Sequence, residues 1–175
     1  AVSASYAYVA DGSSGLRVFQ VSTPSSPLEM GVLNTPGNAQ DVVVEGGHAF
    51  VADGYAGLRI IDVRNPWGPV EVGFFDSAGT LQALGVAVDD GYAYLADFNA
   101  DESGGYLRVI DVSEPTAPLE VGMYEVPYSQ RLTVSEGHVF VAGRPLGLYV
   151  FDDCGPLFAD GFESGDCSEW SAMVP

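Results

Sequence analysis

The stretch HAFVADG, residues 48–54, decides the fold because the chain carries it four times in related form. The other copies are YAYVADG, YAYLADF and HVFVAGR, which start at residues 6, 92 and 138. The spacing between copies is therefore 42 to 46 residues. Self-similarity at a period of roughly 20 to 50 residues is typical of stacked repeat architectures.

Each repeat contains four short apolar segments separated by turn residues. In the second repeat they are DVVVE, HAFVA, LRIID and VEVGFF, within residues 41–75. Val, Ile and Phe favour strands, and Gly-Gly, Asp-Gly and Pro-x-x-Pro sequences favour turns. Four strands in about 45 residues is the size of one β-propeller blade. We therefore predict an all-β fold built from β-propeller blades of four antiparallel strands, since a β-sandwich would not explain the near-constant spacing.

The repeats predict about 3.75 blades followed by an irregular tail, because the fourth repeat has no Pro-x-x-Pro turn and no fourth segment directly after Asp152. Propellers usually contain about four to eight blades. The chain can be part of a larger ring, which we favour, or two chains can complete one ring by self-association. Alternatively, four blades close and another segment supplies the missing strand. The predicted bounds are 1–34, 41–76, 85–125 and 131–152 for the blades and 153–175 for the tail.

The LRIIDV, LRVIDV and YVADG segments resemble LVIVD repeats, the propeller-forming repeats of bacterial surface and secreted proteins. Some of these proteins are grouped as choice-of-anchor proteins. The resemblance covers roughly residues 1–152. It implies a propeller in a secreted or cell-surface bacterial protein, and it implies no catalytic residue.

The tail has two features that favour an extracellular location. DGFESGDCSEW, residues 160–170, resembles a short C-terminal motif of secreted bacterial proteins and indicates export. Cys154 and Cys167 are the two cysteines of the chain, and we predict that they form a disulfide rather than remain free thiols. Alternatively, the tail caps the last blade with its aromatic side chains, Phe158, Phe162 and Trp170.

The composition excludes several classes of partner. Six arginines and no lysine stand against 24 acidic residues, which gives a net charge of −18. Binding to nucleic acid or to an anionic membrane surface requires clustered cations, so neither is expected. No run of 18 apolar residues occurs, so no transmembrane helix is expected.

Asp11, Asp53 and Asp97 recur at one position, directly after the second strand of a blade. They can form an acidic ring that binds a cation or a basic ligand, or they can serve as turn residues. The fourth repeat has Gly143 there, which weakens a symmetric site.

Arg131 and Arg144 flank the last predicted blade and stand out because cations are scarce. They can bind an anionic ligand group near the central opening of the propeller. Alternatively, they form ion pairs with nearby carboxylates.

The third repeat contains an insertion, FNADESGGY, that starts at Phe98. Oxygen-bearing side chains alternate along the insertion, as they do in a calcium-binding loop. The alternative interpretation is a solvated loop that binds no metal. Glu102 replaces the glycine expected at that point in a calcium loop. The candidate ligands are Asp97, Asn99, Asp101 and Glu102.

No nucleophile can be assigned to His48 or His138, which occupy positions where the other repeats have Tyr. A nucleophilic triad is therefore unsupported. We favour a non-catalytic binding scaffold for a protein, glycan or cation. The alternative is an extracellular hydrolase or lyase, calcium-assisted, with a site in the propeller channel.

Overall fold

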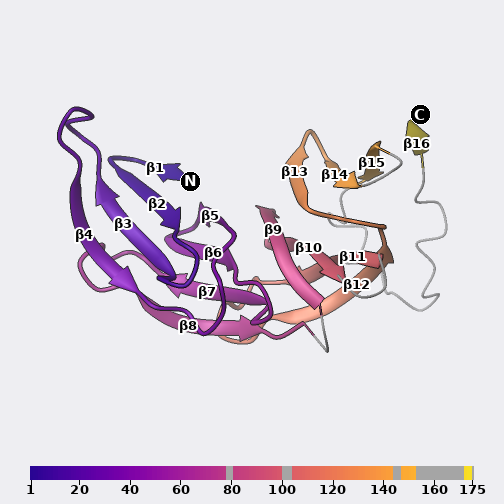
Figure 1. The fold of residues 1–175 in the computed structure, drawn as a ribbon, viewed down its shortest axis with the longest axis horizontal. Helices are drawn as coiled ribbons and strands as arrows, with labels where there is room; N and C mark the ends of the chain where they lie inside the picture. Colours follow the sequence, from indigo (N-terminus) through magenta and orange to yellow (C-terminus); the bar gives the residue numbers. More distant parts are fainter. Residues whose placement is uncertain (78–80, 100–103, 144–146, 153–171, 175) are drawn as a thin grey trace.

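The chain folds into four successive antiparallel sheets in a computed structural model that describes residues 1–77, 81–99, 104–143, 147–152 and 172–174 (Figure 1). Blade 1 contains β1 (Val2–Ser3), β2 (Tyr6–Ala10), β3 (Leu16–Gln20) and β4 (Leu28–Leu33). Blade 2 contains β5 (Asp41–Glu45), β6 (His48–Ala52), β7 (Leu58–Asp62) and β8 (Val70–Phe75). Blade 3 contains β9 (Leu81–Asp89), β10 (Tyr92–Asn99), β11 (Gly104–Asp111) and β12 (Leu119–Glu125). Blade 4 contains β13 (Arg131–Ser135), β14 (His138–Gly143), β15 (Gly147–Asp152) and β16 (Ala172–Val174).

The strands of each blade lie in chain order, so every blade is a meander of antiparallel neighbours. The turns between the first and second strands and between the third and fourth strands therefore lie on one face of the molecule. The turns between the second and third strands and the linkers between blades lie on the opposite face. The predicted all-β fold of propeller-like, four-stranded units is confirmed. In blade 4 the fourth strand is β16, which pairs with β15 from far along the chain.

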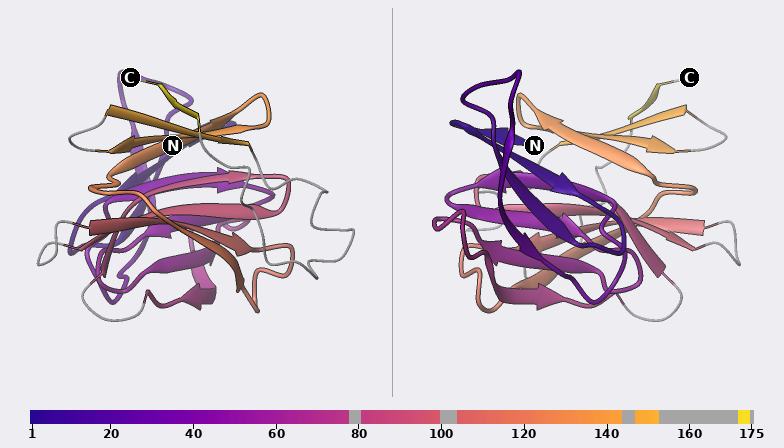
Figure 2. Two further views of the ribbon diagram at one scale, coloured as in Figure 1. Left: turned by 90° about the vertical axis from the view of Figure 1, so that its right-hand side faces the viewer. Right: turned by 60° about the vertical axis from the view of Figure 1, so that its left-hand side comes forward.

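The blades follow one another around an arc, with blade 1 and blade 4 at its two ends (Figure 1). The first strands lie on the inside of the arc, where β9 contacts β5 on one side and β13 on the other. The two turned views show the sheets stacked face to face (Figure 2). The fourth strands β4, β8 and β12 lie on the outside of the arc (Figure 1).

Three apolar cores hold the arc together, one between each pair of neighbouring blades. The core between blades 1 and 2 contains Tyr8, Leu16, Val18, Ala39, Ala49, Val51, Ile61 and Val63. The core between blades 2 and 3 contains Phe50, Ala52, Leu58, Ile60, Ala83, Val86, Ala93, Leu95, Ile110 and Val112. The core between blades 3 and 4 contains Tyr94, Leu107, Val109, Val126, Val139, Val141 and Phe151. Each blade is thus covered on both faces where it has two neighbours, which explains why its strands alternate only weakly in polarity.

Candidate functional site

An arginine near the start of the third strand recurs in blades 1 to 3 and is paired with carboxylates in each. In blade 1, Arg17 lies 3.0 Å from Asp11 and is also paired with Glu29. The arginine projects from the middle of its sheet, because β3 lies between β2 and β4. The acidic partners come from the end of the second strand and from the fourth strand.

Blade 3 repeats this arrangement, whereas the arginine of blade 2 pairs with a carboxylate that follows the fourth strand, and both arginines are more deeply buried. Arg59 lies 2.6 Å from Asp76 and 3.7 Å from Glu71. Arg108 lies 2.5 Å from Asp97 and 2.5 Å from Glu120. The side-chain exposure of the arginine falls from 36% for Arg17 to 10% for Arg59 and 7% for Arg108. Blade 1, at the end of the arc, therefore has the most open cluster.

Asp53 links blade 2 to the segment that leaves blade 1. Its buried carboxylate accepts a hydrogen bond of 2.6 Å from the Thr35 hydroxyl and one of 2.8 Å from the Gly37 amide. Burial raises the pKa of Asp53, while the bonds from Thr35 and Gly37 and the charge of Arg59 oppose that rise. The hydrogen bonds of Asp53 thus link blade 2 to the segment that leaves blade 1, and its side chain has no access to solvent.

Asp97 occupies the same position in blade 3 and is also fully buried. Burial raises its pKa, whereas the guanidinium of Arg108, which donates to the carboxylate, lowers it. Ser77 follows β8 as Thr35 follows β4. The Phe75 ring of blade 2 lies 5.7 Å from the guanidinium carbon of Arg108, so the cluster also contacts the preceding blade.

Asp11 differs from its two equivalents in exposure, because its side chain is 41% exposed, although it accepts from Arg17 of its own blade as Asp97 accepts from Arg108. The structure thus does not place the three repeated aspartates in one open ring, since two are buried between blades. The role of Asp11, Asp53 and Asp97 as ligands of a cation or a basic molecule stays a prediction.

Blade 4 lacks the cluster, because both the aspartate and the arginine are replaced there. Gly143 stands at the position of Asp97, and Tyr149 stands at the position of Arg108. A Cβ atom on Gly143 would lie 2.7 Å from the Tyr149 ring and 2.8 Å from the Pro127 carbonyl oxygen. Asp and Arg are thus replaced together in the fourth repeat. The third strand begins with Leu-Arg in three repeats and with Leu-Tyr in the fourth, and this difference is the sequence signal from which the arginine cluster could have been predicted.

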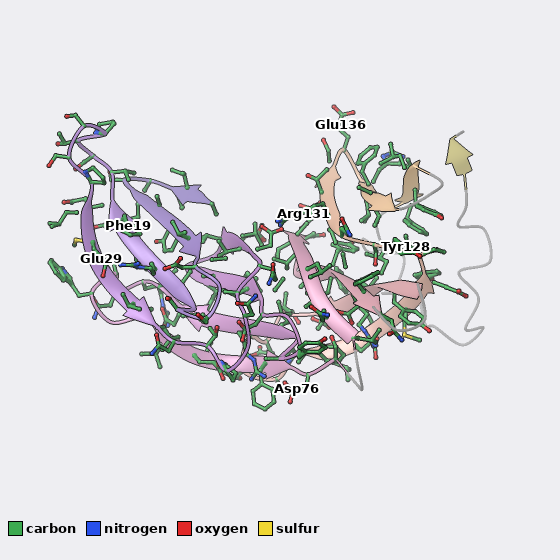
Figure 3. The ribbon with its side chains drawn as sticks, in the orientation of Figure 1. Phe19, Glu29, Asp76, Tyr128, Arg131 and Glu136 are labelled. Atoms are coloured by element: carbon green, nitrogen blue, oxygen red, sulfur yellow. The ribbon has the colours of Figure 1, made fainter. Side chains whose placement is uncertain are left out.

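Arg131 pairs across the inside of the arc, as the view with side chains shows (Figure 3). Its guanidinium lies 3.1 Å from Asp41 of β5, although the residue itself belongs to β13. Asp41 also accepts a bond of 3.4 Å from the Val86 amide of β9. The inner strands of blades 2, 3 and 4 therefore meet at Asp41, and Arg131 is engaged in an ion pair there.

Several predicted site residues lie outside the described residues, namely Asp101, Glu102, Arg144, Cys154 and Cys167. The calcium loop and the disulfide thus stay predictions. Asn99 ends β10 opposite Gly104, and Asp97 is engaged by Arg108. Among the described residues, no group of three or more His, Cys, Asp or Glu side chains is arranged to hold a metal. No described helix is long and apolar enough to cross a bilayer.

A groove of about 340 Å³ lies between blades 2 and 3, on the face opposite the buried aspartates. Glu45 and His48 contribute polar groups at the turn between β5 and β6, and Phe50 contributes an aromatic wall. The other lining residues are Gly46, Val88, Gly91, Val112, Ser113 and Pro115. The mixture of apolar walls and a few polar groups is typical of a binding groove.

The turns around this groove are rich in carboxylates. We call this surface the acidic face, and the described acidic residues at its strand ends and turns are Glu45, Asp62, Asp89, Asp90, Asp111, Glu114 and Glu136. Within the part of the chain that the structure describes, Arg64 is the arginine at these turns, and it forms an ion pair with Asp62. That pair lowers the pKa of Asp62 to about 2. Figure 3 shows Glu136 projecting from the tip of the turn between β13 and β14.

The stacked four-stranded sheets and their repeated junctions define a β-propeller-like repeat protein. The chain belongs to the LVIVD repeat family, whose model matches residues 1–35, 36–77 and 82–126. Among solved structures, the chain is similar to the computationally designed Ika8 protein, with 10% identity and a TM-score of 0.62. The match covers 87% of this chain and 44% of that protein, so the chain spans less than half of its length. No curated protein matches the chain.

Proposed function

We propose that this LVIVD repeat protein is a non-catalytic binding scaffold that holds a basic segment of a partner protein on its acidic face. The observation that carries the proposal is the contrast between the two faces. On the face of the buried aspartates, Arg17, Arg59 and Arg108 neutralise carboxylates within the blades. On the acidic face, Arg64 is the arginine among the described turn residues, and its ion pair joins it to Asp62 alone.

The groove between blades 2 and 3 gives this face a defined point of contact. A Lys or Arg side chain combines a long apolar stem with a charged head. The stem matches the walls formed by Phe50 and Val88, and the head matches the carboxylate of Glu45 at the rim. Charge complementarity of this kind steers association and sets specificity more than it adds affinity.

A catalytic role has less support within the described residues. The carboxylates with raised pKa, Asp53 and Asp97, are fully buried and fastened to neighbouring blades, so they do not face a substrate. Turn residues and ion pairs account for the repeated polar positions. An enzyme would instead require unlike polar side chains from several blades to converge at one end of the channel.

The test is the binding of an arginine-rich peptide to the folded chain, followed by fluorescence anisotropy at low and at physiological ionic strength. We expect saturable binding that weakens as salt rises, because screening reduces the attraction between exposed charges. Glu45→Gln and the double variant Asp89→Asn/Asp90→Asn should weaken binding several-fold.

The matched control is Glu125→Gln, which removes one exposed negative charge from the opposite face. An equal loss for Glu45→Gln and Glu125→Gln would show that only net charge matters and would overturn the assignment to the groove. A failure of the peptide to bind at low salt would overturn the proposed function.

We further propose that the protein is exported to the bacterial surface or the medium. The proposal is supported by the resemblance of residues 160–170 to the C-terminal motif of secreted proteins and by the predicted Cys154–Cys167 disulfide. Deleting residues 154–175 tests it in a secreting host. Retention in the cell supports a sorting role, whereas normal export with lower thermal stability supports capping of blade 4.

A further inference from the structure

Blade 1 carries an apolar face that its own neighbours do not cover. In blades 2, 3 and 4, one face of the second and third strands packs against the preceding blade, and Val51, Leu95 and Val141 are fully buried there. The equivalent residue of blade 1 is Val9, which pairs with Arg17 as Val51 pairs with Arg59. Val9 is 41% exposed.

The remaining residues of this face have kept the apolar character of a blade junction. Ala7, Phe19 and Val21 of blade 1 correspond to Ala49, Ile61 and Val63 of blade 2, which are buried against blade 1. Figure 3 labels Phe19 in the sheet at the end of the arc. An apolar surface rimmed by polar groups marks an interaction site in a soluble protein.

Two further features of blade 1 correspond to groups that face the preceding blade in the junctions seen in the structure. Asp53 receives the Thr35 hydroxyl from the preceding linker, and Asp11 is the equivalent carboxylate with a half-exposed side chain. The Pro-x-x-Pro turns of blades 2 and 3 each pack onto a glycine in the fourth strand of the preceding blade. A Cβ atom on Gly31 would lie 2.5 Å from the Pro66 carbonyl oxygen, and one on Gly73 would lie 2.0 Å from that of Pro115. The turn at residues 24–27 has the same sequence pattern and is exposed.

We propose that this face of blade 1 is a docking surface for one additional LVIVD-type blade. The partner blade carries a glycine in the middle of its fourth strand, which receives the turn at residues 24–27. It also carries a Ser or Thr in the linker that follows, which donates to Asp11. Its apolar face covers Val9 and Phe19, as blade 1 covers Val51 and Ile61.

Blade 4 of a second copy does not have these features. The residue of β16 that pairs with Val150 is Ala172, whereas the residues that pair with Val18, Ile60 and Val109 of β3, β7 and β11 are glycines. A Cβ atom at this position clashes with the proline carbonyl oxygen in both junctions that use such a turn. The occupant is therefore a blade of the type found in blades 1 and 2 and not the end of a second copy.

The experiment adds the missing partner by placing a copy of residues 1–42 before Ala1. The pairing of Val2 with Ala7 matches that of Val44 with Ala49, so Ala1 corresponds to Val43 and the copied linker joins in register. We expect slower amide hydrogen exchange in β2 and β3 and a higher thermal midpoint. Asp11→Ala should have little effect on the midpoint of the original chain and should lower that of the extended chain by several degrees.

The matched control carries Gly31→Ala and Thr35→Val within the copied segment only. Equal protection of β2 and β3 by the control and by the intact extension would overturn the proposal. If the extended chain does not fold, a copy of residues 36–77 followed by residues 36–42 provides a second extension with its own Gly73 and Ser77. A stable homodimer of the original chain that protects β2 and β3 to the same extent would overturn the assignment in favour of a second copy.

Discussion

The hydroxyl of Thr35 donates a hydrogen bond of 2.6 Å to the carboxylate of Asp53, and the two residues belong to neighbouring structural units. Thr35 lies in the linker that leaves blade 1, whereas Asp53 follows the second strand of blade 2. The bond is buried, so it is not weakened by competition with water. It fixes the position of the linker at the same place where the apolar faces of the two blades meet.

Replacing this hydroxyl should destabilise the junction between blades 1 and 2. Thr35→Val keeps the shape of the side chain but leaves the buried Asp53 carboxylate without one of its donors. We expect a loss of about 1–3 kcal/mol in the free energy of unfolding. Urea unfolding followed by circular dichroism measures it. Thr23→Val, at an exposed turn, is the control and should change stability little.

The buried pair of Asp97 and Arg108 should be strongly interdependent. Asp97→Ala leaves the Arg108 guanidinium buried beside Glu120 with its fully buried partner removed, so we expect a loss of about 3–5 kcal/mol. Arg108→Met in the same chain should recover much of that loss, because it removes the charge left behind. A double-mutant cycle measures the coupling, and additive effects of the two substitutions would contradict it.

The fourth-strand glycines should differ in their tolerance of alanine. Gly73→Ala places a methyl group 2.0 Å from the Pro115 carbonyl oxygen, so we expect a loss of about 1–3 kcal/mol from overpacking. Gly122 stands at the same strand position in blade 3, but the nearest atom to its Cβ would be 3.6 Å away. Gly122→Ala should therefore be neutral or slightly stabilising. Thermal unfolding of the two variants distinguishes them, and equal destabilisation would show that the proline turn is not the cause.

The stability of the protein should rise as the pH is lowered through the raised pKa values of Asp53 and Asp97 toward 3.8, and it should fall below that pH. Asp53 and Asp97 have folded pKa values above 3.8, so between that value and their own the native state holds protons that the unfolded chain has lost. Stability then decreases as the pH rises through this window. The net charge of −18 acts in the same direction through self-repulsion.

Asp62 has the opposite effect at lower pH. Its folded pKa is about 2, so the stabilisation from its pair with Arg64 is present above 3.8 and is lost as the pH falls toward 2. A thermal midpoint measured across the acidic range should therefore pass through a maximum near pH 4. A thermal midpoint that falls steadily from neutrality to pH 4 would contradict the raised pKa values of Asp53 and Asp97. Asp53→Asn should make the increase in thermal midpoint on acidification toward pH 4 smaller.

The fold was predictable from the sequence because the same pattern of strand-forming and turn-forming segments occurs in each of the four repeats. The role of the repeated aspartates was only half predictable. Asp-Gly after a strand reads as a turn, and the partner that buries Asp53 is Thr35, which lies 18 residues earlier in an unremarkable linker. The packing of glycine against a proline turn was equally hidden, since Gly31 and Pro66 belong to different blades. Contacts between repeats leave no local periodicity in the sequence, and this is the physical reason why the junctions required the structure.

Fourth-strand glycines and linker hydroxyls give the junctions of blades 1 and 2 and of blades 2 and 3 a direction. At the junction of blades 1 and 2, Gly31 and the hydrogen-bond donor Thr35 lie in the half that leaves the ribosome first. The acceptor Asp53 and the turn that starts at Pro66, which packs onto Gly31, lie in the half that is translated afterwards. Since each unit of a repeat protein contacts only its neighbours, a finished blade can serve as the template for the next while translation continues. We expect co-translational folding of this chain to advance from the N-terminus one blade at a time.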